Sequence, residues 1–396
     1  VLVGLLGLCF AEAGSRVTAS GGFYAYANAA FGPVAGGVTG LLLFIKSVIS
    51  AAALARFLLD SLAETSPYLA SPFAGIAVLA LIYGVLAVTN ILGASDGSRL
   101  TVALGLIKLV PMFALILIGL LMAPVNHISW PALPSAHALG EGTLVLFFAF
   151  LGLESGLNIS GETRDPTRTI PRAIALALVM VAILYIGLQL SAANVLGPAL
   201  PNARTPLIDV ARVTLGEWGA YFVFGVSVVS VLGYLVGDIL SSPRIGYALA
   251  EAGQMPRWFR YVHPRHHTPS VAIGIYAVLV VLVTASGSFE QLALITVSGT
   301  LMLYLITCLG VFRLRARHVA DAGEPFVTPG GSLEPLAAAA IILWLLSTLA
   351  WAKIGAAILI VAAASLFYGL RQRRTATASG DPTDAPVDRD ANACAD

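Results

Sequence analysis

The sequence predicts an all-α protein that spans a membrane many times. Of its 396 residues, 58% are hydrophobic and only 11% are charged. Soluble domains carry about 25% charged residues, so this composition suits a chain that faces lipid. The apolar residues also gather in about eleven runs separated by Gly, Pro and charge, and about 20 such residues span a bilayer as one helix.

The first apolar run, residues 1–10, is too short to span, and it begins with Val1 rather than Met. We therefore expect the chain to start inside a transmembrane helix. Ten further spans are predicted at residues 31–59, 72–92, 100–122, 139–157, 170–195, 218–240, 269–285, 289–311, 333–351 and 354–370. Residues 1–371 then form one transmembrane domain. The Asp-, Pro- and Thr-rich tail, residues 372–396, is predicted to be disordered.

Lys and Arg predict the orientation of these spans. With the loop at Arg16 in the cytoplasm, alternation leaves sixteen basic residues inside and four outside, as the positive-inside rule requires. The inside set is Arg16, Arg99, Arg164, Arg168, Arg172, Arg244, Arg257, Arg260, Arg265, Arg313, Arg315, Arg317, Arg371, Arg373, Arg374 and Arg389. The chain is thus expected in the plasma (inner) membrane with a cytoplasmic C-terminus. Two lysines, Lys46 and Lys108, remain at membrane depth.

One predicted helix is interrupted at Gly152 and Glu154 before the charged loop 162–172. A break with a carboxylate at membrane depth is tolerated only where it is buried in protein or lines a wet cavity. The sequence therefore predicts a binding site there. The alternative is that Gly152 merely allows close helix packing.

Other chemistry is not indicated. The three cysteines have neither metal-ligand spacing nor a disulfide framework. The histidines within 263–267 lie in a basic loop, and we interpret them as structural. There is no nucleophile–base set, Walker loop or dinucleotide fingerprint, and a net charge of +1 gives no sign of nucleic-acid binding. We expect no enzyme activity, no cofactor and no metal.

Several motifs resemble the amino acid–polyamine–organocation (APC) transporter superfamily. Residues 12–16 (EAGSR), 20–26 (SGGFYAY) and 31–33 (FGP) are similar to the second and third helices of that superfamily. Residues 148–154 (FAFLGLE) and 161–172 (GETRDPTRTIPR) are similar to its sixth helix and the loop that follows. Residues 242–256 (SPRIGYALAEAGQMP), 263–265 (HPR) and 268–269 (TP) are similar to the loop after its eighth helix.

The resemblance implies a five-plus-five inverted-repeat fold with broken helices and alternating access. Its substrate would lie between the unwound parts of helices one and six, and the first helix would be missing from this chain. A weak internal symmetry agrees: the long helices that hold Lys46 and Asp238 lie five helices apart in opposite orientation.

The resemblance also assigns roles around the break. Where a helix unwinds, its last carbonyls lose their helical partners, and the C-terminal helix end is negative. The carbonyls of Leu151, Gly152 and Leu153 would then bind a substrate ammonium group. Phe148 would cover the substrate as a gate, or be an ordinary core aromatic. Glu154 would titrate during the cycle, or be a fixed hydrogen-bond acceptor.

Lys108 lies about ten residues into its helix, near the membrane midplane. In related transporters that do not use sodium, a lysine here takes the place of the ion, bracing helices one, five and eight. The alternative is a lysine that snorkels to the interface, although ten residues at about 1.5 Å each is a long reach.

Lys46 and Asp238 would line the pocket for the substrate side chain. Each alone is costly in a membrane, and together they could neutralise one another. We expect an ion pair that a polar substrate side chain engages, or one that only holds the helices together.

The sequence thus predicts a secondary active amino acid permease that is proton-coupled or an exchanger, and not sodium-coupled. Its partners would be an amino acid, protons and the bilayer. One alternative is a polyamine or amine transporter, favoured by Asp238 and opposed by Lys46. Another is a non-transporting, truncated membrane protein. Neither the amino acid nor the oligomeric state follows from the sequence.

Overall fold

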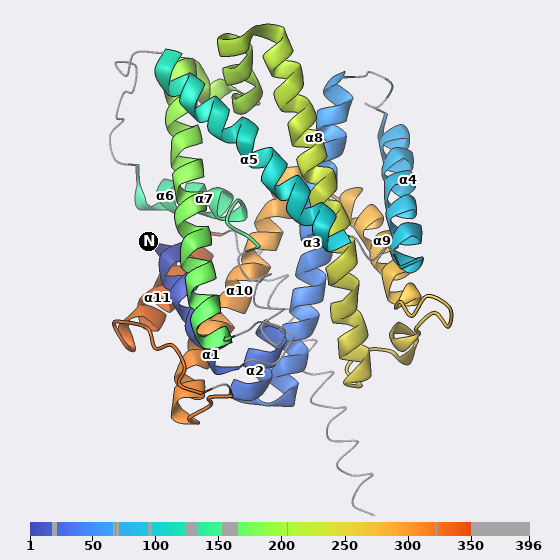
Figure 1. Cartoon of the computed structure of the whole chain (residues 1–396), viewed down its shortest axis with the longest axis vertical. Coiled ribbons are helices and arrows are strands. Elements are labelled where there is room, and N and C mark those ends of the chain that lie inside the picture. Colours follow the sequence, from blue (N-terminus) through green and yellow to red (C-terminus); the bar gives the residue numbers. More distant parts are fainter. Residues whose placement is uncertain are drawn as a thin grey trace, which may run out of the picture.

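A computed structural model describes residues 1–17, 22–65, 68, 71–93, 97–122, 134–152, 165–203, 205–321 and 323–349. These residues form eleven α-helices and two 3₁₀ helices (Figure 1). They are α1 (Leu2–Arg16), α2 (Phe23–Phe31), α3 (Pro33–Thr65), α4 (Pro72–Ile91), α5 (Gly97–Met122), α6 (Ala136–Phe148), α7 (Pro166–Leu196), η4 (Gly197–Asn202), α8 (Pro206–Glu251), η5 (Arg257–Arg260), α9 (Ser270–Thr284), α10 (Phe289–Ala316) and α11 (Leu333–Thr348). The predicted all-α fold is confirmed.

By length and composition, five of the described helices can cross a membrane. They cover Pro33–Ala63, Phe73–Ile91, Thr167–Asn202, Pro206–Glu251 and Phe289–Ala316. Shorter apolar helices occupy Lys108–Met122, Ala136–Phe148, Ser270–Thr284 and Leu333–Thr348. Each span predicted within the described residues coincides with a helix. The predicted span 354–370 and the tail 372–396 lie outside them.

Several helix boundaries differ from the prediction. The first helix extends beyond its apolar run to Arg16, because the charge of Glu12 is compensated inside the protein. Residues 23–31 form a helix of their own, since Gly32 (φ 95°) turns the chain before Pro33 begins α3. The eighth helix begins at Pro206, well before residue 218, and kinks at Gly216 (φ 74°).

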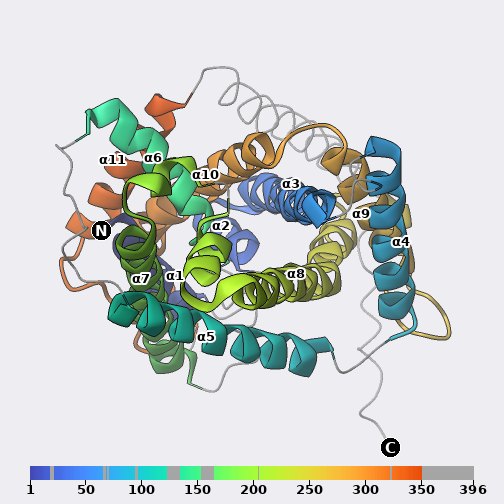
Figure 2. The same ribbon diagram turned by 90° about the horizontal axis from the view of Figure 1, so that it is seen from above.

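The long helix α3 lies at the centre of the described bundle. It contacts α2, α8, α9 and α10, and Figure 2 shows it between α10 and α8. The helices α5 and α4 lie at the edges, α5 against α7 and α8 and α4 against α9. Phe148, at the end of α6, packs against an apolar cluster to which α3 and α8 both contribute.

The buried side chains form two main apolar clusters. One joins α1, α2, α10 and α11, and at its centre the ring of Tyr304 lies 4.7 Å from Phe10 and 5.9 Å from Phe147. The other joins α3, α4, α8 and α9 around Phe44, whose ring lies 5.8 Å from Tyr276. Each edge-to-face aromatic pair adds about 0.5–1.5 kcal/mol beyond its buried area.

The outer helices expose large apolar side chains. Leu81 on α4, Leu117 on α5 and Ile183 on α7 are 68%, 60% and 59% exposed. Such surfaces are unfavourable in water and are neutral against lipid tails. This pattern fits a multi-pass membrane protein, as the composition predicts.

Candidate functional site

The helix α6 ends where the sequence predicts a break. Its last helical residue is Phe148. The next three residues close tighter turns, with N–H groups of Ala149, Phe150 and Leu151 donating to carbonyls three residues back at 3.0–3.2 Å. Gly152 then has φ 109°, a conformation that favours glycine. The chain therefore leaves the helical path inside an apolar stretch.

One carbonyl at the break has a partner that the sequence did not reveal. The Tyr185 hydroxyl on α7 donates a hydrogen bond to the carbonyl of Ala149 at 2.6 Å. The Tyr185 ring also packs edge-on against Phe150 at 5.1 Å. Nothing in the sequence distinguishes Tyr185 from any other aromatic in an apolar helix. Its contacts tie the end of α6 to α7.

The predicted gate residue lies between the two main clusters. Phe148 is half-buried and contacts both. Its ring is perpendicular to that of Phe289, at the start of α10, with centroids 5.6 Å apart. Phe57 on α3 lies 5.7 Å from the same Phe289 ring. Phe148 thus belongs to an aromatic group that links α6, α10 and α3.

The other predicted residues of the break are only partly visible. Leu151 is half-buried against the α1–α10 cluster, and Gly152 is exposed. Leu153 and Glu154 lie outside the described residues. Their predicted roles in binding and coupling therefore remain predictions.

Asp238 is buried and bound by two hydroxyl groups. Tyr276 on α9 donates a hydrogen bond to its Oδ2 at 2.6 Å, and Ser242 donates to its Oδ1 at 2.7 Å. Ser242 lies one turn further along α8, so one bond is local and the other joins two helices. These two bonds explain how the chain accommodates a carboxylate at membrane depth, since a buried charge requires such partners.

Lys46 and Asp238 are both buried, each only 9% exposed. The carboxylate oxygens of Asp238 accept hydrogen bonds from hydroxyl groups, and the charge of Lys46 acts on the same carboxylate. Lys46 lies on α3 opposite Gly299 of α10, where an added Cβ would be 3.8 Å from the Lys46 Cβ. The ion pair expected between the two residues stays a prediction.

More polar groups surround Asp238 than the sequence suggested. Ser50 on α3 is 3.1 Å from the hydroxyl of Tyr234, and Asn90 on α4 donates to the carbonyl of Ile239 at 2.9 Å. The buried hydroxyl of Tyr83 has no hydrogen-bond partner among the described residues. Because these groups come from three helices, α3, α4 and α8, no local motif could have indicated them.

Lys108 is half-buried on α5, which packs against α7 and α8. Its ammonium group makes no hydrogen bond or ion pair with any part of the chain that the structure describes. The predicted role of Lys108 in bracing the helices and in coupling stays a prediction.

A second buried carboxylate lies on α1. Glu12 on α1 has no exposed surface, and it accepts bonds from Arg16 at 2.9 Å and from Arg315 on α10 at 2.6 and 2.7 Å. The backbone N–H of Thr328 adds a bond at 3.0 Å. The motif at residues 12–16 therefore has a structural explanation that joins α1, α10 and the loop after α10.

Comparison with known proteins identifies the class. A profile described as amino acid permease matches residues 1–377. The chain belongs to the amino acid permease family. It is therefore a membrane transporter and not an enzyme, and the resemblance seen in its motifs is confirmed.

The relatives of this permease are named for different substrates. The serine/threonine exchanger SteT of Bacillus subtilis is 26% identical over 380 residues, covering 93% of this chain and 86% of the exchanger. A vacuolar cationic amino acid transporter 4 of Arabidopsis thaliana is 26% identical over 84% of this chain and 58% of its own length. A methylthioribose transporter of B. subtilis is 23% identical over 93% of this chain and 83% of its own length.

Proposed function

We propose that this permease is a secondary active amino acid transporter that binds substrate at the interrupted end of α6 and works by alternating access. The observation that carries the proposal is the end of α6 at Phe148, followed by Gly152 at φ 109°. Carbonyls at a helix C-terminus lack intrahelical partners and lie at the negative end of its dipole. They suit an ammonium group.

In this proposal the carbonyls of Leu151, Gly152 and Leu153 bind the amino group. Phe148 closes over the substrate, since its ring already joins α6 to α10 through Phe289. Glu154 supports the break. Tyr185 fixes the first turn of the break by binding the Ala149 carbonyl, so substrate binding falls to the carbonyls that follow.

Lys46 and Asp238 would act on the distal side of the same site. The bonds from Tyr276 and Ser242 support a structural role for Asp238, because its oxygens are already engaged. Lys46 lies between α3 and α10 and is the stronger candidate for contact with a polar substrate side chain. A cationic substrate is the second possibility, favoured by the similarity to the cationic amino acid transporter of Arabidopsis and opposed by Lys46.

We further propose that coupling is to protons or to exchange, and not to sodium. The support is Lys108, a cation at membrane depth on α5 that supplies the positive charge a bound sodium ion would otherwise supply. We also propose that the protein lies in the plasma membrane with its C-terminus in the cytoplasm, and the distribution of Lys and Arg supports this orientation.

The test uses two glycines of the same segment. In proteoliposomes, Gly152→Ala should reduce amino acid uptake about tenfold, since an alanine at that φ costs about 1–3 kcal/mol of backbone strain. Gly142→Ala is the matched control: Gly142 is helical, and an added Cβ there meets nothing within 4 Å. Equal uptake by the two variants would contradict a site at the break.

Substrate and coupling are tested in the same vesicles. The twenty amino acids, methylthioribose and common polyamines are offered as competitors, with and without a proton gradient or sodium. We expect competition by amino acids and no effect of sodium. Competition by polyamines alone would favour the second possibility, and sodium-dependent uptake would contradict the coupling proposal.

A further inference from the structure

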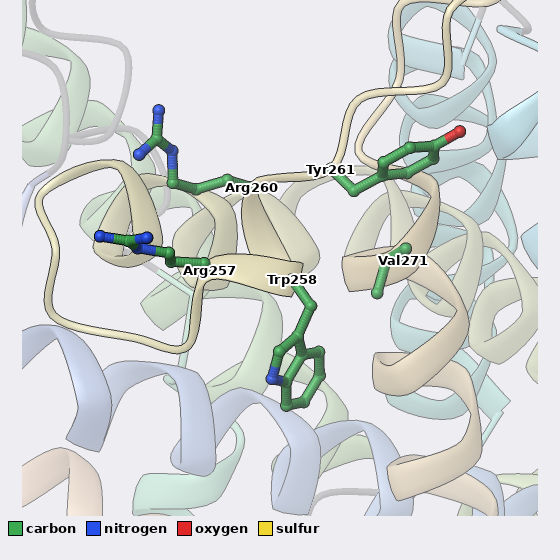
Figure 3. A pocket seen from close by; sticks show the side chains of 5 residues that line it. All are labelled: Arg257, Trp258, Arg260, Tyr261 and Val271. Atoms are coloured by element: carbon green, nitrogen blue, oxygen red, sulfur yellow. The ribbon is translucent and has the colours of Figure 1, made fainter.

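A hollow lies beside the turn η5, outside the proposed transport site. Its volume is about 560 Å³, and it is lined by Arg257, Trp258, Arg260, Tyr261 and Val271 (Figure 3). Four of these residues belong to the loop between α8 and α9, and Val271 is in the first turn of α9. The lining therefore combines two guanidinium groups, two aromatic rings and the start of an apolar helix.

The turn that carries these side chains is firmly anchored. Phe259 is only 4% exposed, and its ring is perpendicular to that of Phe44 on α3 at 6.0 Å. An added Cβ on Gly246 of α8 would lie 3.2 Å from the same ring. With Phe259 inserted into the core, its neighbour Trp258 is directed outward and is 53% exposed.

The two arginines of the hollow are not ion-paired within the described part of the chain. Arg257 and Arg260 are exposed, and neither makes an ion pair or side-chain hydrogen bond with another described residue. Figure 3 shows both side chains extending to the same side of η5. Glu251, at the end of α8, accepts a hydrogen bond from Tyr247 at 2.7 Å instead. Among the described residues, no carboxylate therefore forms an ion pair with either arginine of this basic hollow.

An apolar stripe runs from the hollow along α9. Val271 lines the hollow, and Val278 and Leu282 follow at spacings that place all three on one helix face. Val278 and Leu282 are 58% and 62% exposed. From Val271 to Leu282 the helix rises about 16 Å, about half of the ~30 Å hydrocarbon core. That is the depth of one leaflet.

We propose that this hollow binds the phosphate headgroup of an anionic phospholipid, whose acyl chain lies along the Val271–Leu282 stripe. Guanidinium groups bind phosphate oxygens in a planar, two-pronged geometry. Trp and Tyr are enriched at the membrane interface, where Trp258 and Tyr261 would lie. The positive-inside rule assigns this loop to the cytoplasmic leaflet, where basic pockets beside membrane helices bind anionic headgroups.

The test compares lipids on the purified full chain by native mass spectrometry. Phosphatidylglycerol should be retained, and phosphatidylcholine should be retained much less. The double variant Arg257→Gln/Arg260→Gln should bind phosphatidylglycerol roughly tenfold to thirtyfold more weakly, as expected for two basic contacts. Arg265→Gln is the matched control, because Arg265 is exposed in the same loop but does not line the hollow.

A second measurement follows Trp258 itself. Brominated phosphatidylglycerol should quench the wild-type protein more than it quenches Trp258→Phe, and inorganic phosphate should not reverse the quenching. Equal binding of the two lipids, or an equal loss in Arg265→Gln, would overturn the proposal. Displacement by millimolar phosphate would also overturn it, by showing a site for a soluble anion.

Discussion

Arg315 on α10 binds the buried carboxylate of Glu12 on α1 through two nitrogens. Its Nε lies 2.7 Å from Oε1 and its Nη2 lies 2.6 Å from Oε2. This two-pronged contact is the strongest geometry an arginine can offer a carboxylate. The same Nη2 is 2.8 Å from the hydroxyl of Thr328. The arginine therefore connects α1, α10 and the loop that follows α10.

Replacing Arg315 should destabilise the permease strongly. Removing one partner of a buried pair costs about 3–5 kcal/mol, and we expect the lower end of that range for Arg315→Ala because Arg16 still binds Glu12 at 2.9 Å. Arg315→Lys should be intermediate, since an ammonium group cannot make the two-pronged contact. Unfolding in mixed micelles measures the difference. The control is Arg313→Ala, which removes an exposed cation two residues earlier on α10 and should change the stability little. A similar loss of stability in this control would refute the expectation.

Removing the hydroxyl group from each of two buried tyrosines near Asp238 should change the stability of the protein in opposite directions. Tyr276→Phe removes a 2.6 Å bond to the carboxylate and should cost about 1.5–3 kcal/mol, the usual value for a bond to a charged group. Tyr83→Phe removes a buried hydroxyl without a partner in the described structure and should be neutral or stabilising. Thermal unfolding of the two purified variants compares them directly, and an equal effect would argue against the assigned contacts.

The bond from Tyr185 to the Ala149 carbonyl should matter for transport more than for folding. Tyr185→Phe keeps the ring contact with Phe150 and removes only the 2.6 Å bond. We expect a stability change of about 1 kcal/mol and a larger relative decrease in the maximal rate of uptake, since the break would lose its fixed geometry. Uptake kinetics and thermal unfolding on the same preparation separate the two effects. A variant that transports normally would show that Tyr185 is only a packing residue.

Lys108 should control the dependence of uptake on the proton gradient. If its charge replaces a bound cation, Lys108→Gln should abolish stimulation by a proton gradient while the protein stays folded. Uptake is measured at several external pH values in proteoliposomes. Arg313→Gln is the control, because it removes a cation outside the proposed site. Unchanged stimulation in Lys108→Gln would exclude the coupling role.

The helices could be predicted from sequence because their signals are local. Long apolar runs bounded by Gly, Pro and charge place α4, α7 and α9 within a few residues of their observed bounds. The break at Gly152 was equally visible, since a glycine and a carboxylate interrupt an apolar run. Pro33 likewise marks the start of α3.

The partners of the buried charges could not be predicted, because they come from distant parts of the chain. The ion pair expected between Asp238 and Lys46 stays a prediction, but nothing in the sequence indicated that the same carboxylate accepts hydrogen bonds from Tyr276 and Ser242. Hydroxyl groups can fill the acceptor sites of a carboxylate without carrying a charge, and aromatic residues are common in such helices. Tyr185 was missed for the same reason. The predicted end of the first helix lies too early, because the ion pair that Glu12 forms with Arg315 depends on the folded arrangement of α1 and α10 and is not visible in the local sequence.

The distance along the chain between Glu12 and Arg315 has a consequence for synthesis. The two residues are 303 positions apart, which at about 5–20 residues per second is a delay of roughly 15–60 s. Throughout that interval the nascent first helix holds a carboxylate whose main counter-charge does not yet exist. Arg16, one turn away at 2.9 Å, can shield it from the moment both leave the ribosome. Arg16 would then serve as the early partner of Glu12 and Arg315 as the final one. A ribosome-bound intermediate of Arg16→Gln should therefore be more prone to degradation than the finished Arg16→Gln protein.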